Sequence, residues 1–186
     1  MSNVYSNSDE RIFFLSDDID EASTGKICND ILCLIAKDDK EESEKKEYTR
    51  EPIKLYISSF GGGIYSMWAL IDTIMNSKTP IYTYCLGKAM SAGFKIFLAG
   101  HKRFIYPHST LMYHQVNCFR SGKYQDLVED REEMDWIQQE IENYVIERTK
   151  LTRETLKSIR EKKQDVYYHA QDIINLGMAD EIIERK

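Results

Sequence analysis

The chain has 186 residues, of which 42% are hydrophobic and 30% charged, and its formal net charge is −6 at pH 7. This length and apolar content predict one domain with a full core. The acidic balance argues against binding to nucleic acid or to an anionic membrane, which clustered lysine and arginine would favour. Since the sequence shows no leader-type start and no apolar run of membrane-spanning length, we expect a cytoplasmic protein.

The first half of the chain alternates strand-like and helix-like stretches. Residues 11–20 open with an apolar run typical of a buried strand, and residues 23–37 carry isoleucine and leucine at helical spacing. Residues 37–51 are dominated by charge without an apolar repeat, which predicts a charged surface insertion that is solvated or disordered. Next come a predicted strand, a glycine turn and a helix at 52–59, 60–63 and 64–78.

The second half continues the alternation. Residues 79–87 predict a strand, residues 94–100 a buried helix, and two strand-like runs follow at 102–107 and 109–115. Strands alternating with helices in this way indicate an α/β fold with mainly parallel strands.

A long amphipathic helix is predicted between residues 125 and 150. Its apolar stripe consists of Leu127, Met134, Ile137, Ile141 and Tyr144. Such a stripe serves either core packing or an oligomer contact, and the pattern leaves both open.

Ser91 lies in "LGKAMSAGF", where the predicted strand meets the predicted helix. A serine at such a junction commonly caps the helix, and the alternative is a nucleophile. The nucleophile motif G-x-S-x-G is half present, because Gly93 follows Ser91 but Ala89 takes the first glycine's place. The N–H of Ala92, together with a backbone donor from another loop, would form an oxyanion hole. The glycines at 61–63 allow close backbone approach but match no nucleotide-binding spacing.

A nucleophilic serine needs a base, commonly an imidazole oriented by a carboxylate. His114 ends a strand-like run, so it would lie in the same region as Ser91. Candidates for the carboxylate are Asp165, Asp172 and Asp180, and spacing alone does not choose among them.

Five segments resemble, in the same order, those of the ClpP family, the proteolytic subunit of Clp protease. They are "RIFFLSDDID", "LYISSFGGGI", "GKAMSAGF", "PHSTLMYHQV" and "QDVYYHAQDIINLGMADEII". The resemblance spans residues 9–186. It implies a crotonase-like (ClpP-like) α/β fold in which residues 1–186 form a single domain with a protruding handle helix, the handle region covering about 117–150.

Carried over by position, the resemblance implies that Ser91 is the nucleophile, His114 the general base and Asp165 the orienting carboxylate. It makes the backbone N–H groups of Gly62 and Ala92 the oxyanion donors. It further implies a serine endopeptidase that cleaves unfolded proteins and peptides inside a ring chamber. This chain would need no cofactor or metal, since ATP is used by a partner AAA+ unfoldase. Two stacked heptamers are the implied assembly, either homomeric or mixed with a second ClpP-type subunit.

Departures from the family pattern suggest where this chain differs. Phe60 and Val116 replace prolines, while Lys163 and Gln164 stand where many members have an acid and an arginine. The polar residues 1–9 resemble no axial loop, and we expect them not to form an ordered gate. The alternative functions are a crotonase-type acyl-CoA enzyme and a weakly active ring subunit of a mixed Clp complex.

Overall fold

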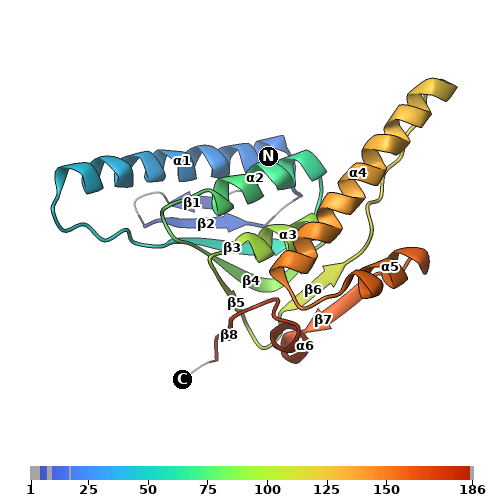
Figure 1. The fold of residues 1–186 in the computed structure, drawn as a ribbon. Coiled ribbons are helices and arrows are strands. Elements are labelled where there is room, and N and C mark those ends of the chain that lie inside the picture. Colours follow the sequence, from blue (N-terminus) through green and yellow to red (C-terminus); the bar gives the residue numbers. More distant parts are fainter. Residues whose placement is uncertain (1–4, 8–9, 17, 185–186) are drawn as a thin grey trace.

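An eight-stranded sheet of mainly parallel strands organises the fold in the computed structural model, which describes residues 5–7, 10–16 and 18–184 (Figure 1). The strands are β1 (Tyr5–Asn7), β2 (Ile12–Leu15), β3 (Ile53–Ser59), β4 (Ile81–Met90), β5 (Lys102–Ile105), β6 (Thr110–Tyr113), β7 (Val166–His169) and β8 (Glu181–Ile182). The helices are α1 (Glu21–Glu44), α2 (Ile64–Met75), α3 (Ala92–Ala99), α4 (Tyr124–Arg148), α5 (Arg153–Glu161) and α6 (Ala170–Asn175). The predicted α/β class with mainly parallel strands is confirmed.

The longest strand, β4, divides the sheet. The strand order is β1-β2-β3-β4-β5-β8, and β6 pairs with β4 while β7 pairs with β6. Residues 82–85 of β4 pair with β5, whereas residues 88–90 pair with β6. Gly87, with φ of 80°, lies between the two segments, in a region of backbone space that glycine enters without strain. The last residues of β4 therefore run beside β6.

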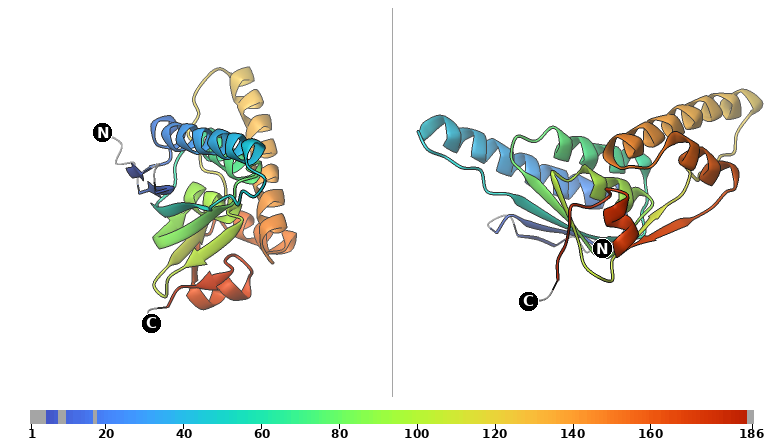
Figure 2. Two further views of the ribbon diagram at one scale, coloured as in Figure 1. Left: turned by 90° about the vertical axis from the view of Figure 1, so that its left-hand side faces the viewer. Right: turned by 60° about the horizontal axis from the view of Figure 1, so that its bottom comes forward.

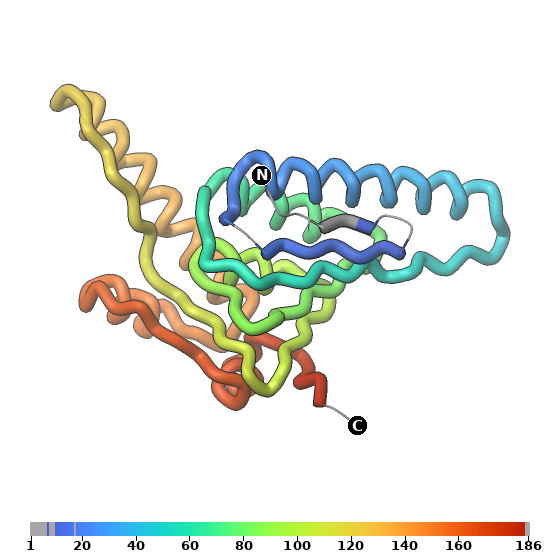
Figure 3. The backbone as a smooth tube through the Cα atoms, turned by 180° about the vertical axis from the view of Figure 1, so that it is seen from behind, coloured from blue at the N-terminus to red at the C-terminus, as the bar shows by residue number. Residues whose placement is uncertain are grey.

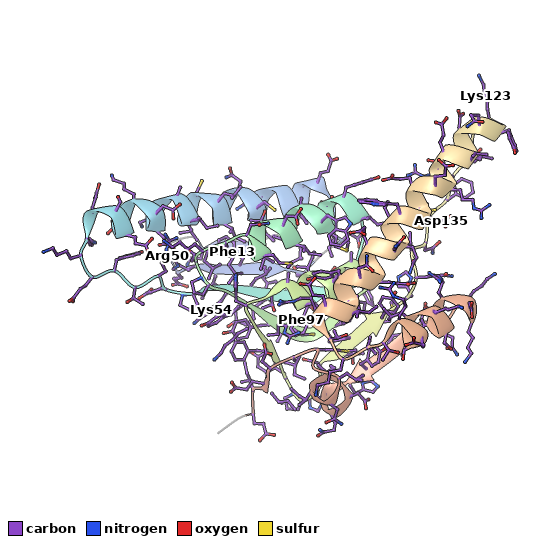
Figure 4. The ribbon with its side chains drawn as sticks, viewed as in Figure 1. Phe13, Arg50, Lys54, Phe97, Lys123 and Asp135 are labelled. Atoms are coloured by element: carbon purple, nitrogen blue, oxygen red, sulfur yellow. The ribbon has the colours of Figure 1, made fainter. Side chains whose placement is uncertain are left out.

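Helices α1, α2 and α3 cover one face of the sheet (Figures 1 and 2). The apolar spacing predicted for the first two helices is what buries them, because residues three and four apart share one helix face. On α1 these are Ile27, Ile31 and Leu34, and on α2 they are Met67, Leu70, Ile71 and Ile74. Phe13 of β2 and Phe97 of α3 are fully buried between the layers (Figure 4).

Helix α4 projects from the body at its amino-terminal end. The chain leaving β6 runs outward to the start of this helix, which then returns to the core (Figure 3). Lys123 lies at the projecting end (Figure 4). The predicted apolar stripe is divided accordingly: Ile137 and Ile141 are buried in the core, whereas Leu127 keeps 42% of its surface exposed. The stripe thus serves core packing only in its second half.

Part of the interpretation of residues 37–51 is wrong. Residues 37–44 are not a loop but the last turns of α1, and only residues 45–51 lie outside regular structure. Asp38 is fully buried and accepts hydrogen bonds from Arg11, Tyr48 and Thr79. The buried Asp38 carboxylate therefore attaches the end of α1 to the body of the protein, although this segment has no apolar repeat that would have predicted a buried face.

The sequence analysis did not predict every element, and β1, α5, β7 and β8 are additions from the structure. Helix α5 begins after Thr152, whose side chain accepts a hydrogen bond from the Thr155 N–H. Tyr5–Asn7 pairs with β2 as an antiparallel strand. The rest of the expectation for residues 1–9 concerns residues 1–4 and 8–9, which lie outside the described part of the chain. Within the described residues, every helix is too short or too polar to cross a membrane.

Candidate active site

Three neighbouring strands bring the candidate catalytic residues together. Ser91 follows β4, and its N–H donates to the carbonyl of Met112 in β6, with an N···O distance of 2.9 Å. His114 follows β6 directly. Since helices begin or loops turn where strands end, such side chains gather at one edge of the sheet. The strand assignments made from sequence thus place Ser91 and His114 at the same edge.

The antiparallel pairing of β6 with β7 adds the carboxylate. Tyr113 lies opposite Val166, so the next pair along the register is His114 and Asp165. The three candidates therefore lie at the ends of β4, β6 and β7, although they are far apart in sequence.

Ser91 adopts a strained turn between β4 and α3. Its φ of 51° and ψ of −117° lie in a region that residues other than glycine rarely enter, at a cost of about 1–3 kcal/mol. A strained strand-to-helix turn is how nucleophile elbows present a serine. Although Ser91 occupies the N-cap position, its side chain makes no cap hydrogen bond. The helix-cap interpretation is therefore wrong.

The Ser91 hydroxyl instead contacts an imidazole. The distance between Ser91 Oγ and His114 Nε2 is 2.8 Å, within hydrogen-bond range. Burial lowers the pKa of His114 below its ordinary value, the charge of Lys95 lowers it further, and the charge of Asp165 opposes this shift. A lowered pKa keeps the imidazole neutral at neutral pH, which is the state that accepts a proton.

Asp165 lies near this imidazole without bonding to it. It is exposed, and together with His114 it lines an open pocket of about 240 Å³. In the part of the chain that the structure describes, no hydrogen bond or ion pair joins Asp165 to His114. Of the other two candidates, Asp180 forms a salt bridge with Arg103 at 2.8 Å, and Asp172 lies within α6. Asp165 is thus the candidate that faces His114.

The glycine turn lies against the serine. A Cβ atom added to Gly61 would come within 2.7 Å of Ser91 Cβ and 3.1 Å of Ala92 N. Ile19 fixes the turn, because its N–H donates to the Gly61 carbonyl and its carbonyl accepts from the Gly63 N–H. These contacts explain why the sequence has glycine at this point.

Two backbone donors remain available beside Ser91. Gly62 and Ala92 line, with Ser91 and His114, a small pocket of about 50 Å³. Among the described residues, no group accepts a hydrogen bond from the N–H of Gly62 or of Ala92. Unpaired N–H groups next to a nucleophile are suited to stabilising a developing oxyanion.

Among the described residues of this pocket that sequence reasoning did not single out, Lys95 is the one with a charged side chain. It lies one helical turn after Ser91 on α3, is 4% exposed and lines the same pocket. Burial lowers the pKa of its ammonium to about 7. The available signal was a single lysine inside the apolar run "FKIFLA", where a charged residue has to be explained.

The fold and the site together define a serine hydrolase on an α/β scaffold. A sequence model described as Clp protease matches residues 1–186, that is, the whole chain. The chain therefore belongs to the Clp protease family, whose members are serine peptidases, and the predicted resemblance is confirmed.

Curated relatives extend this similarity across most of the chain. The ATP-dependent Clp protease proteolytic subunit 2 of Corynebacterium glutamicum is 32% identical over 176 residues, which cover 94% of this chain and 82% of the relative. Proteolytic subunit 3 of Streptomyces coelicolor is 28% identical over 178 residues, 95% of this chain and 76% of the relative. Proteolytic subunit 1 of Prochlorococcus marinus subsp. pastoris is 28% identical over 179 residues, which cover 95% of this chain and 85% of the relative.

Proposed function

We propose that this chain is the proteolytic subunit of an ATP-dependent Clp protease, in which Ser91, His114 and Asp165 cleave peptide bonds of unfolded proteins. The observation that carries this proposal is the 2.8 Å contact between Ser91 Oγ and His114 Nε2 beside two unpaired backbone donors. Serine is a weak nucleophile at neutral pH, so such a contact with a neutral imidazole is what activates it.

The reaction follows from this geometry. Ser91 Oγ attacks the carbonyl carbon of the peptide bond while His114 Nε2 takes the hydroxyl proton. The carbonyl oxygen becomes an oxyanion, which the N–H groups of Gly62 and Ala92 stabilise. His114 then gives its proton to the leaving amine, and a water molecule activated by the same imidazole hydrolyses the acyl-serine. The charge of Asp165 stabilises the positive charge on the imidazole during both steps. To orient the ring as well, Asp165 has to move into hydrogen-bond contact with His114, a contact that it does not make in this structure.

The assembly and the partner belong to the same proposal. The chain forms two stacked heptamers, a tetradecamer, alone or with a second subunit of the family, and it receives unfolded substrates from an AAA+ unfoldase in the cytoplasm. The projecting half of α4 supports this proposal. Leu127 and Met134 line an open hollow of about 260 Å³ there, and its rim carries the charged residues Arg120, Asp130 and Arg131. An apolar floor with a charged rim is a surface suited to a neighbouring subunit.

A fluorophosphonate probe, which reacts with activated serines, tests the catalytic assignment. We expect rapid acylation of Ser91 alone, identified by mass spectrometry of the labelled peptide. Ser91→Ala should abolish labelling and peptide hydrolysis together, while an exposed control, Ser43→Ala, should change neither. Labelling of a different serine, or none in the assembled protein, would overturn the assignment.

A further inference from the structure

The pocket beside Ser91 contains one cation in an otherwise apolar or neutral lining. Its walls include Ile64, Met67 and Ile141, and the only titratable side chains among its described lining residues are Lys95 and His114. Lys95 reaches this pocket because residues four apart lie on the same face of a helix, and Ser91 precedes it by four.

The Lys95 ammonium is buried without a carboxylate partner. Its Nζ lies 5.0 Å from the centre of the Tyr113 ring. Within the described residues, it forms no ion pair or hydrogen bond, and the buried Tyr113 hydroxyl also has no hydrogen-bond partner. Glu142, which lies on the neighbouring helix α4, is already bound by Arg160 and Gln138. Lysine is rarely buried unless paired, and the face of the Tyr113 ring is a weaker partner than a carboxylate. The ammonium therefore still lacks a counter-charge.

We propose that Lys95 makes this site selective for substrates with an acidic side chain at the residue whose carbonyl Ser91 attacks. The inference rests on the proposed function, since it concerns the substrate of that same site. The oxyanion donors Gly62 and Ala92 would hold the attacked carbonyl, and both line the pocket that contains Lys95. The side chain of that residue therefore starts at the pocket.

A carboxylate is the group that this pocket fits best. The volume of about 50 Å³ exceeds the space that one water needs, and it accommodates the few atoms of a short side chain. An apolar side chain would leave the buried ammonium unpaired, whereas a carboxylate forms a charge-assisted hydrogen bond with it. Because the ammonium is already desolvated in the free protein, only the carboxylate still has to lose water on binding.

The test compares peptides that differ only at the residue before the cleaved bond. Fluorogenic peptides ending in glutamate, glutamine or leucine are hydrolysed by the full-length assembled protein at pH 6.5, where most of the Lys95 side chains carry a proton. We expect kcat/KM for glutamate to exceed that for its neutral isostere glutamine by at least about tenfold, as a charged hydrogen bond predicts. Lys95→Met should remove or reverse this ratio and improve cleavage after leucine.

Lys88→Met is the matched control. The Lys88 ammonium lies over the Phe60 ring, 4.2 Å from its centre, and Lys88 is not among the residues lining the pocket. This variant should keep the glutamate-to-glutamine ratio within about twofold of wild type, because the partly buried Lys88 ammonium lies outside the pocket. Loss of the ratio in Lys88→Met would assign the preference to the general field of the surface and would overturn the role of Lys95.

The glutamate-to-glutamine ratio of the wild-type protein tests the proposed selectivity even if Lys95→Met fails to fold. Equal or slower cleavage after glutamate than after glutamine, in a protein whose Ser91 labels and whose leucine peptide is cleaved, overturns the inference and leaves the proposed function intact. No cleavage of any peptide together with no labelling of Ser91 would instead contradict the proposed function.

Discussion

His114 Nε2 lies 2.8 Å from Ser91 Oγ, where burial, and then the charge of Lys95, hold the pKa of the imidazole below 6.5. A general base acts in its neutral form, so a lowered pKa extends activity toward acid. We expect the rate at which a small fluorophosphonate labels Ser91, which does not depend on a substrate side chain, to stay level to below pH 6.5 and then to fall as His114 becomes protonated. The pH–rate profile of the assembled protein measures this.

Lys95→Met separates the two causes of this shift. Methionine keeps the site buried but removes the charge, so the pKa of His114 should rise and the acid limb should move to higher pH. An acid limb centred above pH 6.5 in wild type, or one that moves to lower pH in the variant, would contradict this account.

Asp165→Asn should lower kcat by orders of magnitude, in line with the roughly 10⁴-fold loss seen when a triad carboxylate is neutralised. The expected cause is loss of orientation and charge at the imidazole, not unfolding, because Asp165 is exposed. Steady-state kinetics measures the loss of kcat, and a thermal melt of the same sample shows whether the variant is still folded. The control is Asp172→Asn, which removes a carboxylate within α6 and should leave kcat near wild type. Similar losses in the two variants would remove the special role of Asp165.

Gly61→Ala should disturb the serine directly. The added Cβ would lie 2.7 Å from Ser91 Cβ, and the Gly61 φ of 120° is unfavourable for alanine. We expect slower labelling of Ser91 by a fluorophosphonate and a loss of stability of about 1–3 kcal/mol. Gly25→Ala is the matched substitution within α1, where the new Cβ meets nothing within 4 Å. It should stabilise the protein by about 0.5–1 kcal/mol and leave labelling unchanged.

The placement of Ser91 and His114 at one edge of the sheet was predictable because it depends on local sequence patterns. Ser91 and His114 each follow a strand whose apolar and aromatic residues mark it clearly, and parallel strands bring their ends together. Asp165 was different: three aspartates fitted equally well until the resemblance selected one. Only the antiparallel register of β6 and β7 places it opposite His114. Register depends on pairing between distant segments, which a single sequence does not specify.

Buried charges account for most of what the sequence did not reveal. Lys95 and Asp38 both look like surface residues by type, yet each is at least 96% buried. Asp38 lies inside because Arg11, Tyr48 and Thr79 supply its hydrogen bonds, and these donors come from separate parts of the chain. The charge-rich residues 37–44 were therefore interpreted as part of a surface insertion, although they belong to α1 and contain the buried Asp38.

Asp38→Asn should lower the free energy of unfolding by about 3 kcal/mol, because it breaks a buried ion pair and leaves the Arg11 guanidinium without its counter-charge. Chemical denaturation at pH 7 measures the loss. Asp39→Asn is the control: Asp39 pairs with Arg50 but is 58% exposed, so its loss should stay below about 1 kcal/mol. Equal effects would contradict the buried role of Asp38.

The same carboxyl predicts a pH dependence of stability. Burial alone would raise the pKa of Asp38, but hydrogen bonds from Arg11, Thr79 and Tyr48 outweigh it and lower the pKa to about 2. A group whose pKa is lowered by folding stabilises the protein above its unfolded value, here 3.8, and loses this contribution as pH falls toward 2. The difference in stability between wild type and Asp38→Asn should therefore shrink between pH 4 and pH 2. If the difference in stability stayed constant from pH 4 to pH 2, the lowered pKa of Asp38 would be contradicted.

The two halves of α4 should respond differently to charge. Ile141 is 3% exposed within the chain, so Ile141→Asp buries an unpaired carboxyl and should unfold the subunit, at a cost of several kcal/mol. Leu127 is 42% exposed on the projecting half, so Leu127→Asp should leave the subunit folded but weaken the proposed double ring. Sedimentation velocity and circular dichroism on the same samples separate assembly from folding. Leu127→Met keeps the apolar surface and should assemble like wild type. If Leu127→Asp sediments as the wild-type assembly, or if wild type is an active monomer, the projecting half of α4 is not the contact between rings.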